Sequence, residues 1–242
     1  MKKTKFLLPF LAAASFGAGF ASADVIVNVS QDGWIDHNDG DVKDGGTGIR
    51  LNVATPNPSG AQQYSRVAYF GFDVSGINLN LVTAVTFNVT AASDIASSYN
   101  GVSNYRFYLV DNTLNDFFDE TTLTDANAPG HTNGNRLTGQ RTAGTIIGDV
   151  AVSDPAANQV ISVSFSEASL ADLLNDTNSF LTVVAEFRGE NNVGYGNFTG
   201  LGFNSKESGQ GAGLNFTVVP EPSSLAFIGL GAATLAFRRR RV

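Results

Sequence analysis

Residues 82–90 have the sequence Val-Thr-Ala-Val-Thr-Phe-Asn-Val-Thr. From Val85 onward an apolar side chain alternates with a polar one, which is typical of a β-strand with one face buried and the other in water. The same alternation recurs at residues 105–109, 161–166, 181–188 and 214–218. Residues 67–72, Val-Ala-Tyr-Phe-Gly-Phe, are almost all apolar and predict a central strand that is covered on both faces.

The segments between these strands contain turn-forming residues. Gly, Asn, Asp and Pro cluster at residues 38–48, 55–60, 127–135 and 189–197. One short helix is expected, because Ser166 can cap it, Glu167 suits its first turn, and Leu170, Leu173 and Leu174 form one apolar side. Residues 112–145 are mostly irregular and are expected to cross one face as a long excursion. About ten strands without a strand–helix rhythm predict an all-β fold, an antiparallel β-sandwich of the jelly-roll type.

Composition excludes several functional classes. The chain has 242 residues, 43% of them hydrophobic, which is enough for one domain with a substantial core. It has no Cys and only two His, so a disulfide scaffold, a thiol nucleophile and a three-His metal site are excluded. Between Asp24 and Val219 there are eight basic and 21 acidic residues. Such an acidic body argues against nucleic acid as a partner, because phosphate binding needs a basic face.

The N-terminus has the features of a secretory signal peptide. A basic start that contains Lys2, Lys3 and Lys5 precedes an apolar and small-residue stretch at 6–20. Ala21-Ser22-Ala23 then gives the small-x-small cleavage pattern, which would leave Asp24 as the first residue. A short membrane anchor is the alternative, but the stretch is short for a span and the cleavage pattern follows it. The predicted domains are therefore a signal peptide at 1–23, a body at 24–218 and a tail at 219–242.

The tail combines three elements. Val219-Pro220-Glu221-Pro222 leads into an apolar run at 225–237, and Arg238, Arg239, Arg240 and Arg241 follow it. The run is short for a stable span, and the arginines would keep its end in the cytoplasm, so transient anchoring in the inner membrane is expected. This pattern resembles the PEP-CTERM sorting signal of Gram-negative bacteria. The resemblance implies processing by an exosortase, export to the cell envelope or extracellular matrix, and a link to exopolysaccharide and biofilm.

The body resembles a second family. The matching segments, in chain order, are residues 45–53 (Gly-Gly-Thr-Gly-Ile-Arg-Leu-Asn-Val), 66–76 (Arg-Val-Ala-Tyr-Phe-Gly-Phe-Asp-Val-Ser-Gly), 82–87, 119–124 with Asn127-Ala128-Pro129, 203–207 and 214–218. They are similar to the DNRLRE (disaggregatase-related) domain, a jelly roll of extracellular carbohydrate-active proteins, some of which bind polysaccharide. Phe117 and Thr124 stand where that family has Trp, and a second Trp-bearing segment is missing.

An Asp-rich stretch suggests structural calcium, the one cofactor that the sequence points to. Its carboxylates are Asp32, Asp36, Asp39 and Asp41, with Asp44 close behind, and they are expected to lie together in one Gly-rich loop. Closely spaced oxygen ligands suit Ca²⁺. The EF-hand pattern fails, because Gly40 and Thr47 stand where an Asp or Asn and a Glu are needed. The alternative is a solvated acidic loop.

Carbohydrate binding would use exposed aromatic rings, on which sugars stack. The candidates are Trp34, Tyr108 and Tyr195, the last within Gly194-Tyr195-Gly196-Asn197. For Trp34 the alternative is packing in the core, and for the tyrosines it is an ordinary position on a sheet surface.

Catalytic patterns are weak. Asp116, Asp119 and Glu120 could supply a glycosidase carboxylate pair, but Glu120 falls in a structural segment of the DNRLRE resemblance. Asp36 and His37 are neighbours, so on a continuous strand they would point to opposite faces. No Gly-x-Ser-x-Gly motif occurs. The sequence therefore favours a non-enzymatic exported protein that binds polysaccharide, with a purely structural or adhesive matrix protein and a glycan-cleaving enzyme as alternatives.

Overall fold

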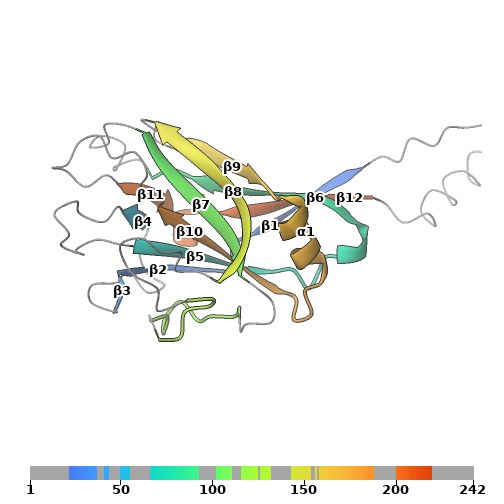
Figure 1. Ribbon diagram of the computed structural model, residues 1–242, viewed down its shortest axis with the longest axis horizontal. Helices are drawn as coiled ribbons and strands as arrows, with labels where there is room; N and C mark the ends of the chain where they lie inside the picture. The colour runs from blue at the N-terminus through green and yellow to red at the C-terminus, as the bar shows by residue number, and fades with distance from the viewer. Residues whose placement is uncertain are drawn as a thin grey trace, which may run out of the picture.

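The computed structural model describes residues 22–36, 41–43, 50–54, 66–92, 102–110, 116–124, 126–131, 143–153, 156, 158–187 and 200–219. Two antiparallel sheets face each other (Figure 1). The first contains, in spatial order, β1 (Ala23–Asn28), β12 (Gly213–Val218), β6 (Val82–Thr90) and β9 (Val160–Ser164). The second contains β3 (Asp41–Lys43), β2 (Gln31–Asp36), β5 (Arg66–Asp73), β10 (Phe180–Phe187), β7 (Val102–Val110) and β8 (Gly144–Ser153). A separate ladder joins β11 (Gly200–Asn204) to β4 (Arg50–Ala54).

The strand order confirms the predicted jelly roll. The order β1-β12-β6-β9 lies opposite β5-β10-β7-β8, with β2 and β3 extending the second sheet beside β5. Without β2 and β3, the eight strands of the two sheets can be numbered one to eight along the chain. Their spatial order is then 1-8-3-6 in the first sheet and 2-7-4-5 in the second. Successive strands therefore alternate between the sheets, except that β7 and β8 are neighbours in the second sheet, and this is the strand order of a jelly roll.

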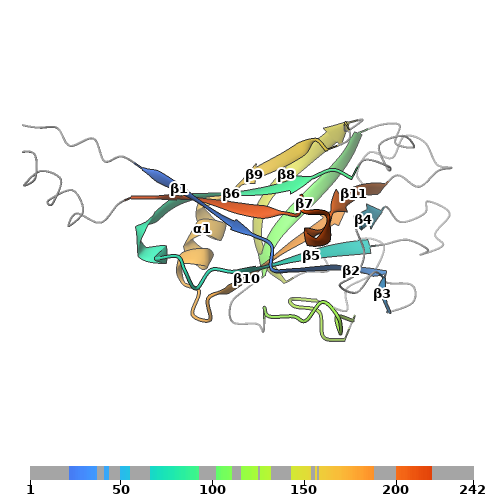
Figure 2. The same cartoon turned by 180° about the vertical axis from the view of Figure 1, so that it is seen from behind.

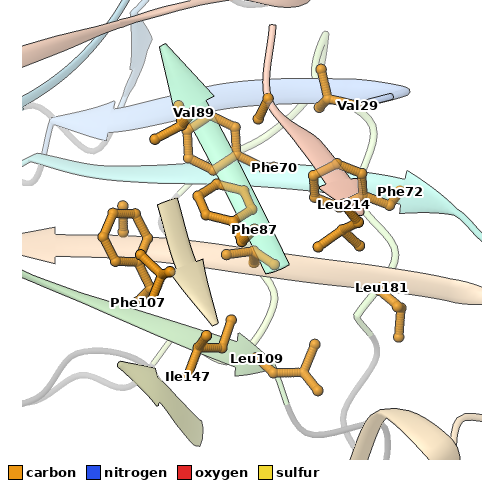
Figure 3. Close-up of a cluster of buried hydrophobic side chains, with 14 of the residues drawn as sticks. Val29, Phe70, Phe72, Phe87, Val89, Phe107, Leu109, Ile147, Leu181 and Leu214 are labelled. Carbon is orange, nitrogen blue, oxygen red and sulfur yellow. The ribbon is translucent and has the colours of Figure 1, made fainter. Parts of the chain in front are cut away.

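The space between the sheets is filled by aromatic side chains. Phe87 of β6 lies 5.4 Å, ring centroid to ring centroid, from both Phe70 of β5 and Phe107 of β7. Phe203 lies 6.0 Å from Phe70 on the β11 side. Figure 3 shows Phe70, Phe87 and Phe107 meeting in the middle of this layer. These tilted and edge-on contacts are the preferred geometries of aromatic pairs, and they bind the two sheets together.

The second sheet is also covered on its outer face. Val67 and Tyr69 of β5 and Val184 of β10 are buried there, against Phe118 and Leu123. The last two belong to the excursion, the described residues 116–124 and 126–131, which run below β2 and β5 in Figures 1 and 2. The two-sided burial of β5 was predicted from the sequence and is confirmed. The excursion predicted at 112–145 is seen in the described residues 116–124 and 126–131, whereas Gly144 and Thr145 already belong to β8.

The helix α1 (Glu167–Leu174) forms where its capping residue predicts it. The Ser166 hydroxyl accepts a hydrogen bond from the Ser169 amide at 3.2 Å, and Glu167 occupies the first turn. Leu173 is fully buried and Leu170 packs partly against the core. Leu174 is exposed, so the predicted apolar side of the helix is narrower than three leucines. Two further single turns are η1 (Leu79–Leu81) and η3 (Lys206–Ser208).

Leu123 is expected to hold the excursion on the sheet. Leu123→Ala should lower the free energy of unfolding by about 2–5 kcal/mol, because it leaves a cavity beneath the excursion. Leu174→Ala removes the same atoms at an exposed position and is expected to cost less than about 1 kcal/mol. The comparison is made by denaturant unfolding. Equal losses in the two variants would show that the excursion is not part of the packed structure.

Candidate functional site

Three carboxylates and one ammonium group meet where β2, the excursion and η3 come together. Oxygens of Asp32, Glu120 and Glu207 all lie within 4.8 Å of one another. The Lys206 amide donates to Asp32 Oδ2 at 2.7 Å, and the Asp32 amide donates to Glu120 Oε2 at 3.0 Å. Lys206 Nζ is paired with Glu120 Oε1 and lies 3.5 Å from Glu207 Oε1. The cluster therefore links segments that lie 86 residues apart or more.

The electrostatics of the cluster centre on Asp32. Its side chain is buried, and burial raises the pKa of this carboxyl to about 7, with the charges of Glu207 and Glu120 acting in the same direction. The Lys206 amide and ammonium oppose that rise. Burial by itself would lower the pKa of Lys206, but the hydrogen bond and charge of Glu120 raise it above its ordinary value. Lys206 thus supplies the positive charge that the three carboxylates need.

The predicted calcium loop takes a different form. Asp32 and Asp36 lie on the same strand, β2, and Asp41 lies on β3, where it is the backbone partner of Asp36. Four residues along a strand span about 13 Å, so Asp32 and Asp36 cannot belong to one compact ion-binding turn. The prediction of a single loop is therefore wrong for Asp32. Asp39 lies outside the described residues, and calcium at the β2–β3 hairpin stays a prediction.

Two of the three aromatic candidates are not on the surface. Trp34 is 4% exposed and belongs to the layer between the sheets, while Tyr108 is fully buried beneath the excursion. At these two positions the second sheet is covered, by the first sheet over Trp34 and by the excursion over Tyr108. The prediction that these two rings stack on a sugar is wrong for this fold. Tyr195 lies outside the described residues.

The carboxylates considered for catalysis serve local structure. The Asp119 carboxylate accepts hydrogen bonds from the amide and hydroxyl of Thr121, and Glu120 is paired with Lys206. Asp116 is buried, and burial raises its pKa to about 6 even though Asn178 Nδ2 donates to Oδ1 at 2.5 Å. The Asp116 carbonyl also accepts the Thr182 hydroxyl. His37 lies outside the described residues.

The outer face of the first sheet is a broad polar surface, and the sequence analysis did not single it out as a site. Strand register places eight Ser, Thr and Asn residues on it, in rows that run across the four strands. They are Asn28 of β1, Asn215 and Thr217 of β12, Thr86, Asn88 and Thr90 of β6, and Ser162 and Ser164 of β9. Asp24 is the one charged residue that the described strands place on this face. The polar residues at every second position of these strands are the sequence signal that could have identified this surface.

The tail meets the fold at one end of this sheet. Val218, the last residue of β12, is paired with Ala23 of β1 and with Val82 of β6. The Val219 amide donates to the Leu81 carbonyl of η1 at 2.9 Å. Figure 2 shows β1, β12 and the start of β6 converging at this end. The fold thus continues to the residue before Pro220.

Residues 218–241 match the model of the PEP-CTERM protein-sorting motif. This confirms the PEP-CTERM resemblance of the tail. The motif indicates a bacterial protein that is exported and sorted to the cell surface or beyond by the processing enzyme exosortase. No curated protein matches the chain.

The matched range shows where the sorting motif and the sandwich overlap. Its first residue, Val218, belongs to β12, and the sorting residues Pro220, Glu221, Pro222 and Arg238–Arg241 lie outside the described residues. Within the described part of the chain, no helix is long and apolar enough to cross a membrane. The predicted signal cleavage after Ala23, with Ala21 at the other small position, stays a prediction.

Asp32 is expected to make the protein less stable as the pH rises. Its pKa is about 7 in the folded state against 3.8 for the ordinary group, so the folded state binds the proton more tightly. The contribution of Asp32 to the free energy of unfolding is therefore greatest below about pH 4, and it is lost as the pH rises to about 7. The loss amounts to a few kcal/mol, at about 1.4 kcal/mol per pKa unit.

Asp32→Asn should flatten this pH dependence, measured as the free energy of unfolding between pH 4.5 and 8. Asn keeps an oxygen that can accept from the Lys206 amide but has no charge to bury. Asp73→Asn is the matched control, because Asp73 is exposed and the hydrogen bonds from Ser75 lower its pKa. A slope that stays the same in Asp32→Asn would contradict the buried cluster.

Proposed function

We propose that this protein is a non-enzymatic component of the envelope or extracellular matrix of a Gram-negative bacterium, and that its sandwich binds neutral polysaccharide. The observation that carries the proposal is the outer face of the first sheet, here called the polar face. It consists of the eight Ser, Thr and Asn residues named above together with Asp24, Ile26, Ala84, Val160 and Gly213.

The chemistry of the polar face suits a neutral glycan. Hydroxyl and amide groups both donate and accept hydrogen bonds, as sugar hydroxyls do. Neighbouring strands lie about 4.8 Å apart, so the rows present such groups at regular intervals to a long polymer. An acidic glycan would be repelled by Asp24 and by the acidic body. With no ring among the residues assigned to this face, affinity for one short segment is expected to be weak and to grow with polymer length.

The DNRLRE resemblance supports the same proposal. The jelly-roll order is the fold that the resemblance implies, and the family belongs to extracellular carbohydrate-active proteins. The proposed binding surface nevertheless uses other residues than the predicted aromatic ones. The absence of activity is proposed because Asp119 and Glu120 are occupied by Thr121 and Lys206, which leaves neither as a ready acid or base.

A second candidate is a purely structural or adhesive role without a sugar site. It is favoured by two apolar side chains at the outer edges of the polar face. Ile26 of edge strand β1 is 68% exposed, and Val160 of edge strand β9 is 57% exposed. Exposed apolar edges favour association with another strand.

Binding is tested by co-sedimentation with insoluble neutral glucans and with the exopolysaccharide of the producing cell. Thr86→Asp and Asn88→Asp together place two negative charges in the middle of the polar face, and the expected result is at least about a tenfold loss of affinity, equivalent to 1.4 kcal/mol. Ala151→Asp adds a charge at an exposed position of β8 and should leave binding unchanged. If the protein without substitutions does not co-sediment with any of these polymers, the adhesive role is the remaining candidate. It is tested by pull-down of one copy of this protein with a second, tagged copy.

Sorting is tested by changing the tail alone. Replacing Arg238 to Arg241 by Ser should weaken retention at the inner membrane, since the cytoplasmic charges are lost. The measurement is cell fractionation with detection of the full-length and processed forms. A variant that ends at Val219 should be exported and keep the β-rich circular dichroism spectrum, because it retains every described element of the sandwich and the bond from the Val219 amide to Leu81. Unchanged processing of the Arg-to-Ser variant would contradict the role given to the arginines.

A further inference from the structure

The sorting motif begins inside the folded body. We define the tail end of the sandwich as Asp24 of β1, residues 78–83 around η1 and residues 217–219, since the predicted signal cleavage would remove Ala23. Val218 is paired with Val82 of β6, packs partly against the core, and opens the matched motif. The next residue, Val219, is held by its bond to Leu81. The backbone that precedes Pro220 is therefore fixed by the fold.

An enzyme cannot bind the backbone of β12 and Val219, which precedes Pro220, as it would bind a free peptide. Enzymes and binding domains often capture an extended segment by adding it as a strand to a sheet, which needs a free backbone edge. β12 has none, because β1 is paired along one side and β6 along the other. Recognition on the N-terminal side of the motif must either peel β12 out of the sheet or accept the folded tail end as it stands.

Distance makes contact with the tail end unavoidable. Pro220 follows Val219 directly, and the five residues 220–224 that precede the apolar run extend at most about 18 Å. A domain of about 100 residues has a radius of gyration near 13 Å, so its diameter exceeds the length of residues 220–224. An enzyme of that size that binds Pro-Glu-Pro does not fit within this length. Its surface must then touch the tail end.

The tail end offers a surface suited to such contact. Asn78, Asn80 and Thr83 are exposed there, and the Thr83 hydroxyl donates to the Thr217 carbonyl at 3.2 Å. Asp24 is its one described charged residue and accepts from the Thr217 hydroxyl at 3.2 Å. The surface therefore mixes these polar groups with the half-buried Leu79 and Leu81, and the predicted cleavage would add an N-terminal ammonium at Asp24.

We propose that the exosortase that reads the motif docks on the tail end of the sandwich, so that the folded body forms part of its substrate. The proposal rests on the sorting motif and is independent of polysaccharide binding. It predicts that the rate of processing depends on the position of Pro220 relative to the sheet, as well as on the sequence of the tail.

The test inserts four or eight Gly-Ser residues between Val219 and Pro220 and follows conversion of the full-length chain to the processed form by pulse-chase in the producing cell. The expected result is a processing rate at least about tenfold lower, the effect of 1.4 kcal/mol of lost contact. The same insertion after Gly209, an exposed position in the turn before β12, is the control and should process normally. Thermal melts of the full-length chains verify that both insertions leave the sandwich folded.

A second pair of variants locates the contact. Asn78→Lys with Asn80→Lys adds charge to the tail end and should slow processing, whereas Ala151→Lys adds it to β8 and should not. The proposal is overturned if the insertion at residue 219 leaves the rate unchanged or raises it, or if the double lysine variant processes like the control. If processing then still depends on Arg238–Arg241, the sorting function stands and only docking fails. If the unchanged chain is exported but never processed, both fail.

Discussion

The structure depends on the burial of β5 and β10 on both of their faces. On the inner side Phe70 packs against Phe87 of the opposite sheet, and on the outer side Tyr69 packs against Phe118 of the excursion. Neighbouring residues of one strand therefore belong to different apolar layers, and neither layer can be lost without exposing half of the central strands. The fold is a jelly roll with a third layer, and this layer decides where the remaining polar groups meet.

The buried acidic cluster follows from that third layer. The excursion brings Glu120 to the start of β2, where η3 brings Lys206, and the ammonium joins the two segments. Asp32 is less favourable as an anion here, because its burial raises its pKa toward 7. The cluster thus joins three segments at the expense of stability at neutral pH. Such a network holds loops in position, whereas the ligand-binding role proposed above lies on the polar face of the other sheet.

Much of the fold could be predicted because period-two alternation is a local signal. It located β6, β7, β9, β10 and β12, and the Ser166 cap located the helix. β8 was missed because a bulge leaves Ile147 without a partner opposite Phe107 and Tyr108, which shifts the alternation within the strand. β2 was taken for a loop because Asp and Gly disfavour strands, and tertiary packing overrides that preference. The pairing of Glu120 with Lys206 spans 86 residues and leaves no pattern in the sequence. For the same reason the burial of Tyr108 beneath the excursion could not be foreseen.

The described fold reaches into the sorting motif, since Val218 belongs to β12 and Val219 is bonded to Leu81. Hydrogen exchange of the full chain, read residue by residue by NMR, tests it most directly. Since the Val219 amide is bonded to Leu81, it should exchange on the slow timescale of the β12 amides. Exchange of Val219 and the end of β12 at the rate of a free peptide would show that the motif hangs clear of the sandwich, and would contradict the account.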